Sequence, residues 1–299
     1  MKRVVSVSLG SSKRNMRVET EVLGEKFTIE RIGTDGDMEK AIQLIEELDG
    51  RVDAFGMGGI DLYVVAGKRR YTFRDAKRIA RAAKTTPIVD GSGLKNTLER
   101  RVVSLLEELD LLSWPGKKVF LVSGADRFGM AQALDQHGAQ VVFGDLMFAL
   151  GLPIPLTSLG KLELAAHTLA PLVCQLPFKY VYPTGDKQGK NTPRFEKYYQ
   201  EADVIAGDFH FIWKHLPLSL PGNTILTNTV TLPDIEALRK RGVGRLVTTT
   251  PNLNGRSFGT NVMEGVLVTV IGKAPEEITA AEYEEALNAI GFIPRVQNL

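Results

Sequence analysis

The chain has 299 residues, a length that suits two domains, each able to bury a core of its own. Hydrophobic residues make up 43% and charged residues 24%, which excludes a disordered or coiled-coil chain. The 37 basic and 35 acidic residues are mixed along the sequence, so no single-sign field is available to hold a phosphate backbone. We therefore expect no nucleic-acid partner, whereas a homo-oligomer is compatible with this composition.

The single cysteine, Cys174, excludes an intramolecular disulfide and a cysteine-rich zinc site. The four histidines show no metal-ligand spacing, so we expect no required metal. The alternating segment Val4–Leu9 is unlike a signal-peptide core, and no run of about 18 apolar residues follows. These features predict a cytoplasmic protein without a membrane partner.

The first third of the chain mixes short strands with helices. Alternating apolar residues predict strands at residues 4–9, 17–23 and 25–32. The next expected elements are a helix from Met38 to Leu48 capped by Asp37, a strand at Val52–Phe55, a hairpin turning near Gly67, a helix at Arg74–Lys84, a strand at Pro87–Val89 and a helix from Leu94 or Lys95 to Leu112. Trp114-Pro115-Gly116 ends that helix, and we place the domain boundary there. Residues 1–113 are then an N-terminal mixed α/β domain on the substrate side.

In residues 114–299, apolar runs alternate with helices, the pattern of a parallel sheet covered on both faces. We expect six strands, at residues 118–123, 140–145, 178–182, 203–208, 224–229 and 245–250. This is the strand number of the dinucleotide-binding fold. Helices are expected to begin at Thr231 and at Thr279, each followed three residues later by an acidic residue. The predicted fold is a Rossmann-type doubly wound sheet with a C-terminal helix.

The segment from Lys117 to Asp145 predicts strand, turn, helix and strand in succession. Gly124 is expected to make the tight turn, and Gly129 to let the helix pack closely while its first N–H groups face a phosphate. Asp145 closes the second strand about twenty residues after Gly124, where an acidic side chain accepts hydrogen bonds from ribose hydroxyls. The pattern predicts NAD rather than NADP as the cofactor.

The turn departs from G-x-G-x-x-G because Asp126 replaces the middle glycine. Arg127 and Phe128 complete the turn and are also candidate cofactor contacts. The alternative interpretation is a βαβ unit whose glycines serve packing alone.

Polar residues follow several of the later strands, at the edge where ligands bind in such sheets. Asp208, Asn228 and Thr229 are candidate cofactor contacts, and His210 is a candidate general acid or base. A packed, hydrogen-bonded histidine is the alternative for His210. The polar loop at residues 184–187 is either part of this edge or a solvated loop.

The first domain offers two loops toward a cleft. Lys95 stands at the opening of a long helix, where a lysine can give a proton to or take one from a substrate oxygen, and Ser92 and Asn96 are candidate substrate contacts beside it. The alternative for Lys95 is a surface lysine at a helix N-terminus. Ser11 and Ser12, after the first strand, are candidate contacts for a substrate carboxylate or phosphate.

The whole chain resembles bacterial quinate 5-dehydrogenases. The likeness is carried by Gly10-Ser11-Ser12, Asp90–Asn96, the Gly124–Gly129 turn and the loops Gly207–His210 and Thr227–Thr229. It implies oxidation of a ring hydroxyl of quinate to 3-dehydroquinate with a nicotinamide cofactor, on a two-domain layout like that of shikimate dehydrogenase. Shikimate dehydrogenases place a catalytic lysine in an N-V-T-x-P-x-K stretch that this chain lacks, and Lys95 is its substitute by position.

These observations together predict an NAD-dependent oxidoreductase acting on a ring hydroxyl of a small polar hydroxy acid, with quinate or shikimate as the leading substrate. A transferase or lyase on the same nucleotide-binding scaffold is the enzymatic alternative, because fold does not fix function. A non-enzymatic dinucleotide-sensing protein is the other alternative.

Overall fold

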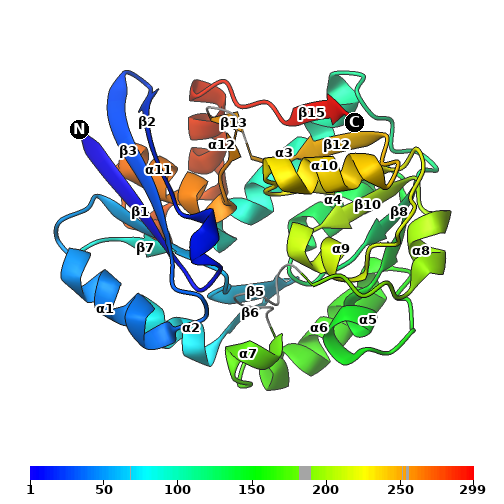
Figure 1. Ribbon diagram of the computed structural model, residues 1–299, viewed down its shortest axis with the longest axis horizontal. Coiled ribbons are helices and arrows are strands. Elements are labelled where there is room, and N and C mark those ends of the chain that lie inside the picture. Colours follow the sequence, from blue (N-terminus) through cyan, green and yellow to red (C-terminus); the bar gives the residue numbers. More distant parts are fainter. Residues whose placement is uncertain (68, 182–189, 251, 254–255) are drawn as a thin grey trace.

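Two β-sheets, each covered by helices, lie beside one another in the molecule (Figure 1). The structure is a computed structural model, and it describes residues 1–67, 69–181, 190–250, 252–253 and 256–299. The fold is α/β, as predicted. Among the described residues, no helix is long and apolar enough to cross a membrane.

The first sheet has the strand order β2-β3-β1-β4-β7. Its strands are β1 (Lys2–Ser8), β2 (Met16–Val22), β3 (Glu25–Gly33), β4 (Ala54–Gly58) and β7 (Ile88–Val89). β1 pairs in parallel with β3 and β4, β4 with β7 in parallel, and β2 with β3 in antiparallel. Val5 packs into the core beneath α1 (Met38–Leu48) and α2 (Arg74–Ala80), whereas Val4 points to the opposite face. Val4 and Val5 lie on opposite faces because successive residues of a strand alternate between them. Both residues are buried, so both faces of the sheet are covered.

The second sheet has the order β9-β8-β10-β11-β12-β15. Its strands are β8 (Lys118–Leu121), β9 (Gln140–Phe143), β10 (Val204–Gly207), β11 (Thr224–Thr227), β12 (Arg245–Thr248) and β15 (Arg295–Asn298). The first five pair in parallel. Val119 and Val204 belong to one core, and Phe120 and Ile205 to another on the opposite face. This sheet is doubly wound, as the sequence predicted.

One of the six strands predicted for the second sheet is wrong. Residues 178–182 were expected to be a strand, but Phe178–Val181 forms the short helix α7. Phe178 and Val181 are three residues apart and both pack against the core of the first sheet, which a helical turn permits. The sixth strand is instead β15, which pairs antiparallel with β12.

The remaining elements connect and cover the sheets. The helices are α3 (Ser92–Glu108), α4 (Phe128–Gln136), α5 (Asp145–Leu150), α6 (Leu159–Val173), α8 (Glu196–Glu201), α9 (Phe209–His215), α10 (Leu232–Lys240), α11 (Thr260–Ile271) and α12 (Ala280–Ala289), with short 3₁₀ turns η1 (Ser12–Arg14) and η3 (Pro275–Glu277). Two small hairpins pair β5 (Tyr63–Ala66) with β6 (Arg69–Thr72) and β13 (Asn252–Leu253) with β14 (Arg256–Ser257). The capping boxes expected at Thr231 and Thr279 are both confirmed.

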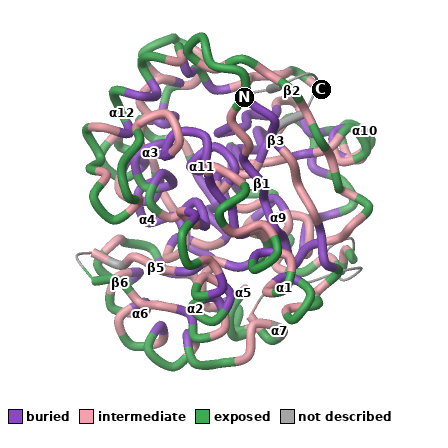
Figure 2. Tube along the Cα trace, turned by 90° about the vertical axis from the view of Figure 1, so that its left-hand side faces the viewer, coloured by how far each residue is buried: buried purple, intermediate pink, exposed green. Residues whose placement is uncertain are grey.

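One helix from each side of Trp114 packs against the sheet formed by the other side. The domain boundary expected at Trp114 therefore does not separate the core of the first sheet from the core of the second. α3, assigned by sequence to the first domain, packs through Leu98 into the core of the second sheet, where Trp114 itself is buried. α11 crosses back and packs on β1 and β4, with Val262 and Val266 against the first sheet. Figure 2 shows β1 and α11 as buried segments inside the molecule.

Candidate functional site

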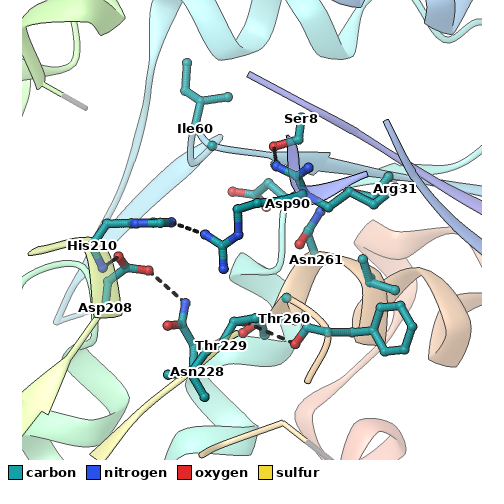
Figure 3. Close-up of a pocket in the computed structure, with 18 of the residues that line it drawn as sticks. Ser8, Arg31, Ile60, Asp90, Asp208, His210, Asn228, Thr229, Thr260 and Asn261 are labelled. Atoms are coloured by element: carbon teal, nitrogen blue, oxygen red, sulfur yellow. Dashed lines mark hydrogen bonds between the residues drawn. The ribbon is translucent and has the colours of Figure 1, made fainter. Parts of the chain in front are cut away.

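A cleft of about 480 Å³ lies between the two sheets, at the carboxyl ends of their parallel strands. The first sheet contributes Ser8 from β1 and Asp90 from the segment after β7. The second contributes Asp126, Asp208 and Asn228, which follow β8, β10 and β11. Figure 3 shows Asp208 and Asn228 side by side on this wall. Ligands of open α/β sheets bind at this edge, so the cleft is the candidate functional site.

The second-sheet wall of the cleft lies where the strand order reverses. β8 has β9 on one side and β10 on the other, and the chain leaves β8 and β10 at the same edge. The turns that follow these strands bring Asp126 and Asp208 to the cleft. Such a switch point leaves a crevice between diverging connections, which is the usual ligand position in this architecture.

Lys95 lines the cleft between two carboxylates. Its Nζ lies 2.9 Å from Oδ1 of Asp61 and 2.8 Å from Oδ1 of Asp126. Lys95 comes from the first turn of α3, Asp61 from the segment after β4 and Asp126 from the turn after β8. Three distant parts of the chain therefore meet at this one charged centre.

The neighbouring charges determine the protonation of this centre. Although burial disfavours its charged form, Asp126 and Asp61 raise the pKa of Lys95, so it remains a cation. Burial and the carboxylate of Asp126 raise the pKa of Asp61 to about 6, against the opposing effect of Lys95. A carboxyl group with a pKa near neutrality exchanges protons in the working range of most enzymes. Asp61 is thus a candidate proton-transfer group, and Lys95 is the positive charge beside it.

Arg127 holds the turn that carries Asp126. Its side chain is 2% exposed and forms ion pairs with Glu99 of α3, with Asp126 at 3.8 Å and with Asp208 at 3.5 Å. A buried arginine requires such partners because an uncompensated buried charge is strongly destabilising. The sequence suggested Arg127 as a cofactor contact, but its charge is matched by carboxylates of the protein.

The glycine turn does not fit a dinucleotide in this structure. The carboxylate of Asp145 accepts the N–H groups of Gly124 at 3.0 Å and Ala125 at 2.8 Å, the kind of donors a pyrophosphate would require. Asp145 begins α5 and does not close β9, which ends at Phe143. A side-chain carbon at Gly124 would lie 2.9 Å from Leu162 of α6, so this helix covers the turn.

Gly129 also serves packing. A side-chain carbon there would lie 2.6 Å from the carbonyl oxygen of Asn96, because α3 and α4 are in close contact. Phe128 is buried in the core of the second sheet. The alternative interpretation of the turn, glycines required for packing alone, describes these contacts.

Four polar residues after β10 and β11 line the cleft, as their positions at the strand ends suggested: Asp208, His210, Asn228 and Thr229. Asn228 donates to Asp208 at 2.8 Å, and Asp208 accepts the backbone N–H of His210 at 2.8 Å. Despite burial, the charge of Arg127 and the hydrogen bonds from the Asn228 amide and the His210 backbone N–H lower the pKa of Asp208. Burial lowers the pKa of His210, so its imidazole is neutral at pH 7.

Two arginines line the first-sheet wall of the cleft. Arg31 of β3 donates to the Ser11 carbonyl and to the Ser8 hydroxyl, both at 3.0 Å. Arg14 of η1 reaches across the cleft, where its Nη1 lies 2.8 Å from Nε2 of His210. These contacts join the two halves of the site through a guanidinium and a neutral imidazole.

The four residues expected to contact substrate lie beside the cleft and do not line it. The hydroxyl of Ser11 accepts from the N–H of Lys13, and the N–H of Ser12 donates to Asp35, so both shape the turn that presents Arg14. Ser92 and Asn96 border a smaller cavity of about 20 Å³ next to Lys95. The polar loop at residues 184–187 lies outside the described residues.

Sequence reasoning missed Asp61 and Arg31. Asp61 follows the Gly58-Gly59 pair at the end of β4, and a polar residue after a buried parallel strand was the available signal. Arg31 lies inside β3 on the same face as Phe27 and Ile29, because residues two apart in a strand share a face. No motif in the sequence marks this arginine as a site residue.

The fold and the cleft define a two-lobed α/β protein with a polar, charged crevice between its lobes. Residues 93–299 match a family described as a domain of unknown function, DUF8754, and residues 3–90 match a second, DUF8753. The chain therefore belongs to the DUF8754 family. No curated protein matches this sequence.

Several solved structures are similar at low identity. A malic enzyme from Thermotoga maritima is 15% identical over 97% of this chain and 84% of its own, with a TM-score of 0.37. A glutamate dehydrogenase from Thermus thermophilus is 14% identical over 97% of this chain and 74% of its own, with a TM-score of 0.44. A solute-binding protein from Burkholderia multivorans is 12% identical over 93% of this chain and 96% of its own, with a TM-score of 0.38. They assign neither substrate nor cofactor to this chain.

Proposed function

We propose that this protein is an enzyme that moves a proton to and from a small polar molecule held in the cleft. The carrying observation is Asp61, a carboxyl group with its pKa raised to about 6, placed 2.9 Å from the ammonium of Lys95 in the cleft wall. As a base, Asp61 accepts a proton from a substrate hydroxyl or from an activated C–H group. The proton then resides on a carboxylate oxygen of Asp61. The negative charge left on the substrate is stabilised by Lys95, which stays protonated.

A second candidate is the NAD-dependent oxidation of a ring hydroxyl in a hydroxy acid such as quinate or shikimate. It is favoured by Asp208, Asn228 and Thr229, polar groups that line the cleft at the carboxyl ends of adjacent parallel strands. Removal of the hydroxyl proton is the step that Asp61 and Lys95 suit. Because the Gly124–Gly129 turn does not fit a dinucleotide, we assign no residue to the hydride acceptor.

Binding and turnover measurements separate these candidates. Quinate and shikimate are added to the purified protein with NAD, with NADP and without cofactor, while cofactor reduction is followed by absorbance and substrate by proton NMR. Dinucleotide-dependent turnover supports the oxidoreductase, and cofactor-free conversion supports other proton-transfer chemistry. Asp61→Asn should lower either activity by about 10²-fold or more. Asp135→Asn, at an exposed position of α4, should leave it intact. Equal activity in both variants contradicts the proposal.

A further inference from the structure

Within the part of the chain that the structure describes, the first-sheet wall of the cleft presents two guanidinium groups without carboxylate ion-pair partners. Arg14 and Arg31 both line the cleft. Among the residues that the structure describes, neither has a carboxylate within ion-pair distance, and their hydrogen bonds go to neutral acceptors: the Ser11 carbonyl, the Ser8 hydroxyl and the His210 ring. Two positive charges therefore face the cleft without direct compensation.

Two other cations that line the cleft, Lys95 and Arg127, differ from this pair. Lys95 contacts two carboxylates, and Arg127 forms ion pairs with three. By contrast, burial and the nearby charge of Arg14 lower the pKa of Arg31 to about 10, against the weaker opposing effect of Asp35. Arg31 is still charged at neutral pH. Like charges held together in a half-buried cleft are unfavourable unless an anion joins them.

The neutral hydrogen bonds hold both guanidinium groups in place. Arg31 is anchored on the first sheet by Ser8 and Ser11, and Arg14 is anchored across the cleft by His210. Figure 3 shows Arg31 beside Ser8 on one side of the cleft and His210 on the other. Guanidinium groups match the paired oxygens of carboxylates and phosphates, and prior orientation reduces the entropy lost on binding.

We infer that Arg14 and Arg31 form a subsite for the oxyanion group, carboxylate or phosphate, of the molecule that the cleft binds. The inference rests on the proposed function, because it names the substrate class of that same site. The substrate is a small anion whose reactive group lies at Asp61 and whose oxyanion group binds Arg14 and Arg31. The anion binding itself requires no turnover, so it is tested separately.

The test compares thermal unfolding in sodium phosphate, sodium acetate and sodium chloride at equal ionic strength. A ligand that binds only the folded state raises the unfolding temperature. The parent protein should be more stable in phosphate or acetate than in chloride, and the larger shift identifies phosphate or carboxylate as the preferred group. Arg14→Gln and Arg31→Lys should each weaken the apparent affinity for that anion by about tenfold or more, the loss expected for a charged hydrogen bond.

Two further variants make the outcome decisive. Arg17→Gln removes an exposed arginine of β2 outside the cleft and should keep the full anion shift, which separates specific binding from general salt effects. Asp61→Asn should also keep the shift, because this substitution removes no positive charge and leaves both guanidinium groups in place. An equal shift in the parent, Arg14→Gln and Arg17→Gln overturns the subsite. A shift confined to proteins with both cleft arginines supports it even if no turnover is found.

Discussion

At the scale of single residues, the surroundings of Asp61 change its pKa and make it better suited to accept a proton than an ordinary aspartate. A free aspartate has a pKa of about 3.9 and is a weak base near neutral pH. Burial and the Asp126 carboxylate raise that pKa to about 6, while Lys95 limits the rise. The same lysine is placed to stabilise negative charge on a neighbouring oxygen, so the proposed base and the proposed electrostatic stabiliser lie within one hydrogen bond of each other.

Replacing Asp61 with Asn should lower kcat by about 10²- to 10⁴-fold, the usual contribution of an acid–base group. Because the base must be ionised, kcat/KM of the parent should fall as the pH drops below about 6. Carboxyl-carbon NMR of labelled protein provides a check without substrate. Asp61 and Asp145 should both titrate near pH 6, and one of these two resonances, that of Asp61, should be missing from the spectrum of Asp61→Asn. A spectrum in which that resonance persists in the variant contradicts the assignment.

Lys95→Met should also lower kcat strongly, because it removes the cation that stabilises the charged intermediate. It should in addition raise the pKa of Asp61, since Lys95 favours the ionised carboxylate. The pH at which kcat/KM declines should therefore move upward in this variant. A raised KM with kcat nearly unchanged would instead assign Lys95 to substrate binding.

Glu264 of α11 makes stability depend on pH. Its side chain is 2% exposed and accepts from the Tyr283 hydroxyl at 2.9 Å, and burial together with Asp90 raises its pKa to about 8. The folded state therefore keeps a proton that the unfolded chain releases above about pH 4.5. This group favours folding most at low pH, and its contribution falls as the pH rises toward 8, by up to about 1.4 kcal/mol for each pH unit.

Glu264→Gln removes that titration and should reduce the decline of unfolding free energy between pH 5 and pH 8, as measured by urea denaturation. Glu284→Gln, at an exposed position of α12, should leave the decline unchanged. Identical pH profiles for the parent and Glu264→Gln would show that Glu264 titrates normally in the folded protein.

At the scale of elements, the contact between α3 and α4 depends on Gly129. Because a side-chain carbon there would approach the Asn96 carbonyl to 2.6 Å, Gly129→Ala should force the helices apart and cost about 1 to 3 kcal/mol of unfolding free energy. Gly160→Ala in α6, where nothing lies within 4 Å, should be neutral or slightly stabilising. Urea unfolding of both variants tests this, and a Gly129→Ala protein as stable as the parent would contradict the packing role.

Elements with strong local signals could be predicted from the sequence, and elements defined by distant partners could not. The helix at Met38–Leu48 and its Asp37 cap agree with the structure because periodicity and capping are local. Phe178–Val181 has an apolar sequence compatible with either strand or helix, and its contacts with the first core decide the outcome. The Lys95 position followed from a helix start, whereas its pairing with Asp61 and Asp126 depends on tertiary structure.

At the scale of the whole molecule, the two sheets are joined by helices α3, α6 and α11, which pack against the sheet formed by the other part of the chain. Ala170 and Cys174, at the end of α6, belong to the core of the first sheet, and α11 covers that sheet's other face. α3 makes the reverse exchange and packs with α4 of the second sheet. The cleft therefore lies between lobes that are tied together by three helices, which keeps Arg31, Lys95 and Asp208 in a defined arrangement.

This exchange predicts that residues 1–113, the first domain expected from sequence, do not fold independently. The fragment lacks α11, so Val4, Ile29 and Ala54, which are fully or almost fully buried in the whole protein, would face water. Exposing such side chains costs about 1.5 to 3 kcal/mol for each large one, a sum comparable to the whole stability of a small domain. Circular dichroism on heating should show a cooperative transition for the full chain and none for the fragment. A fragment with a sharp transition and dispersed amide NMR signals would show that the first sheet is stable without α11. Helices α3, α6 and α11 would then position the cleft without being required for the folding of the first sheet.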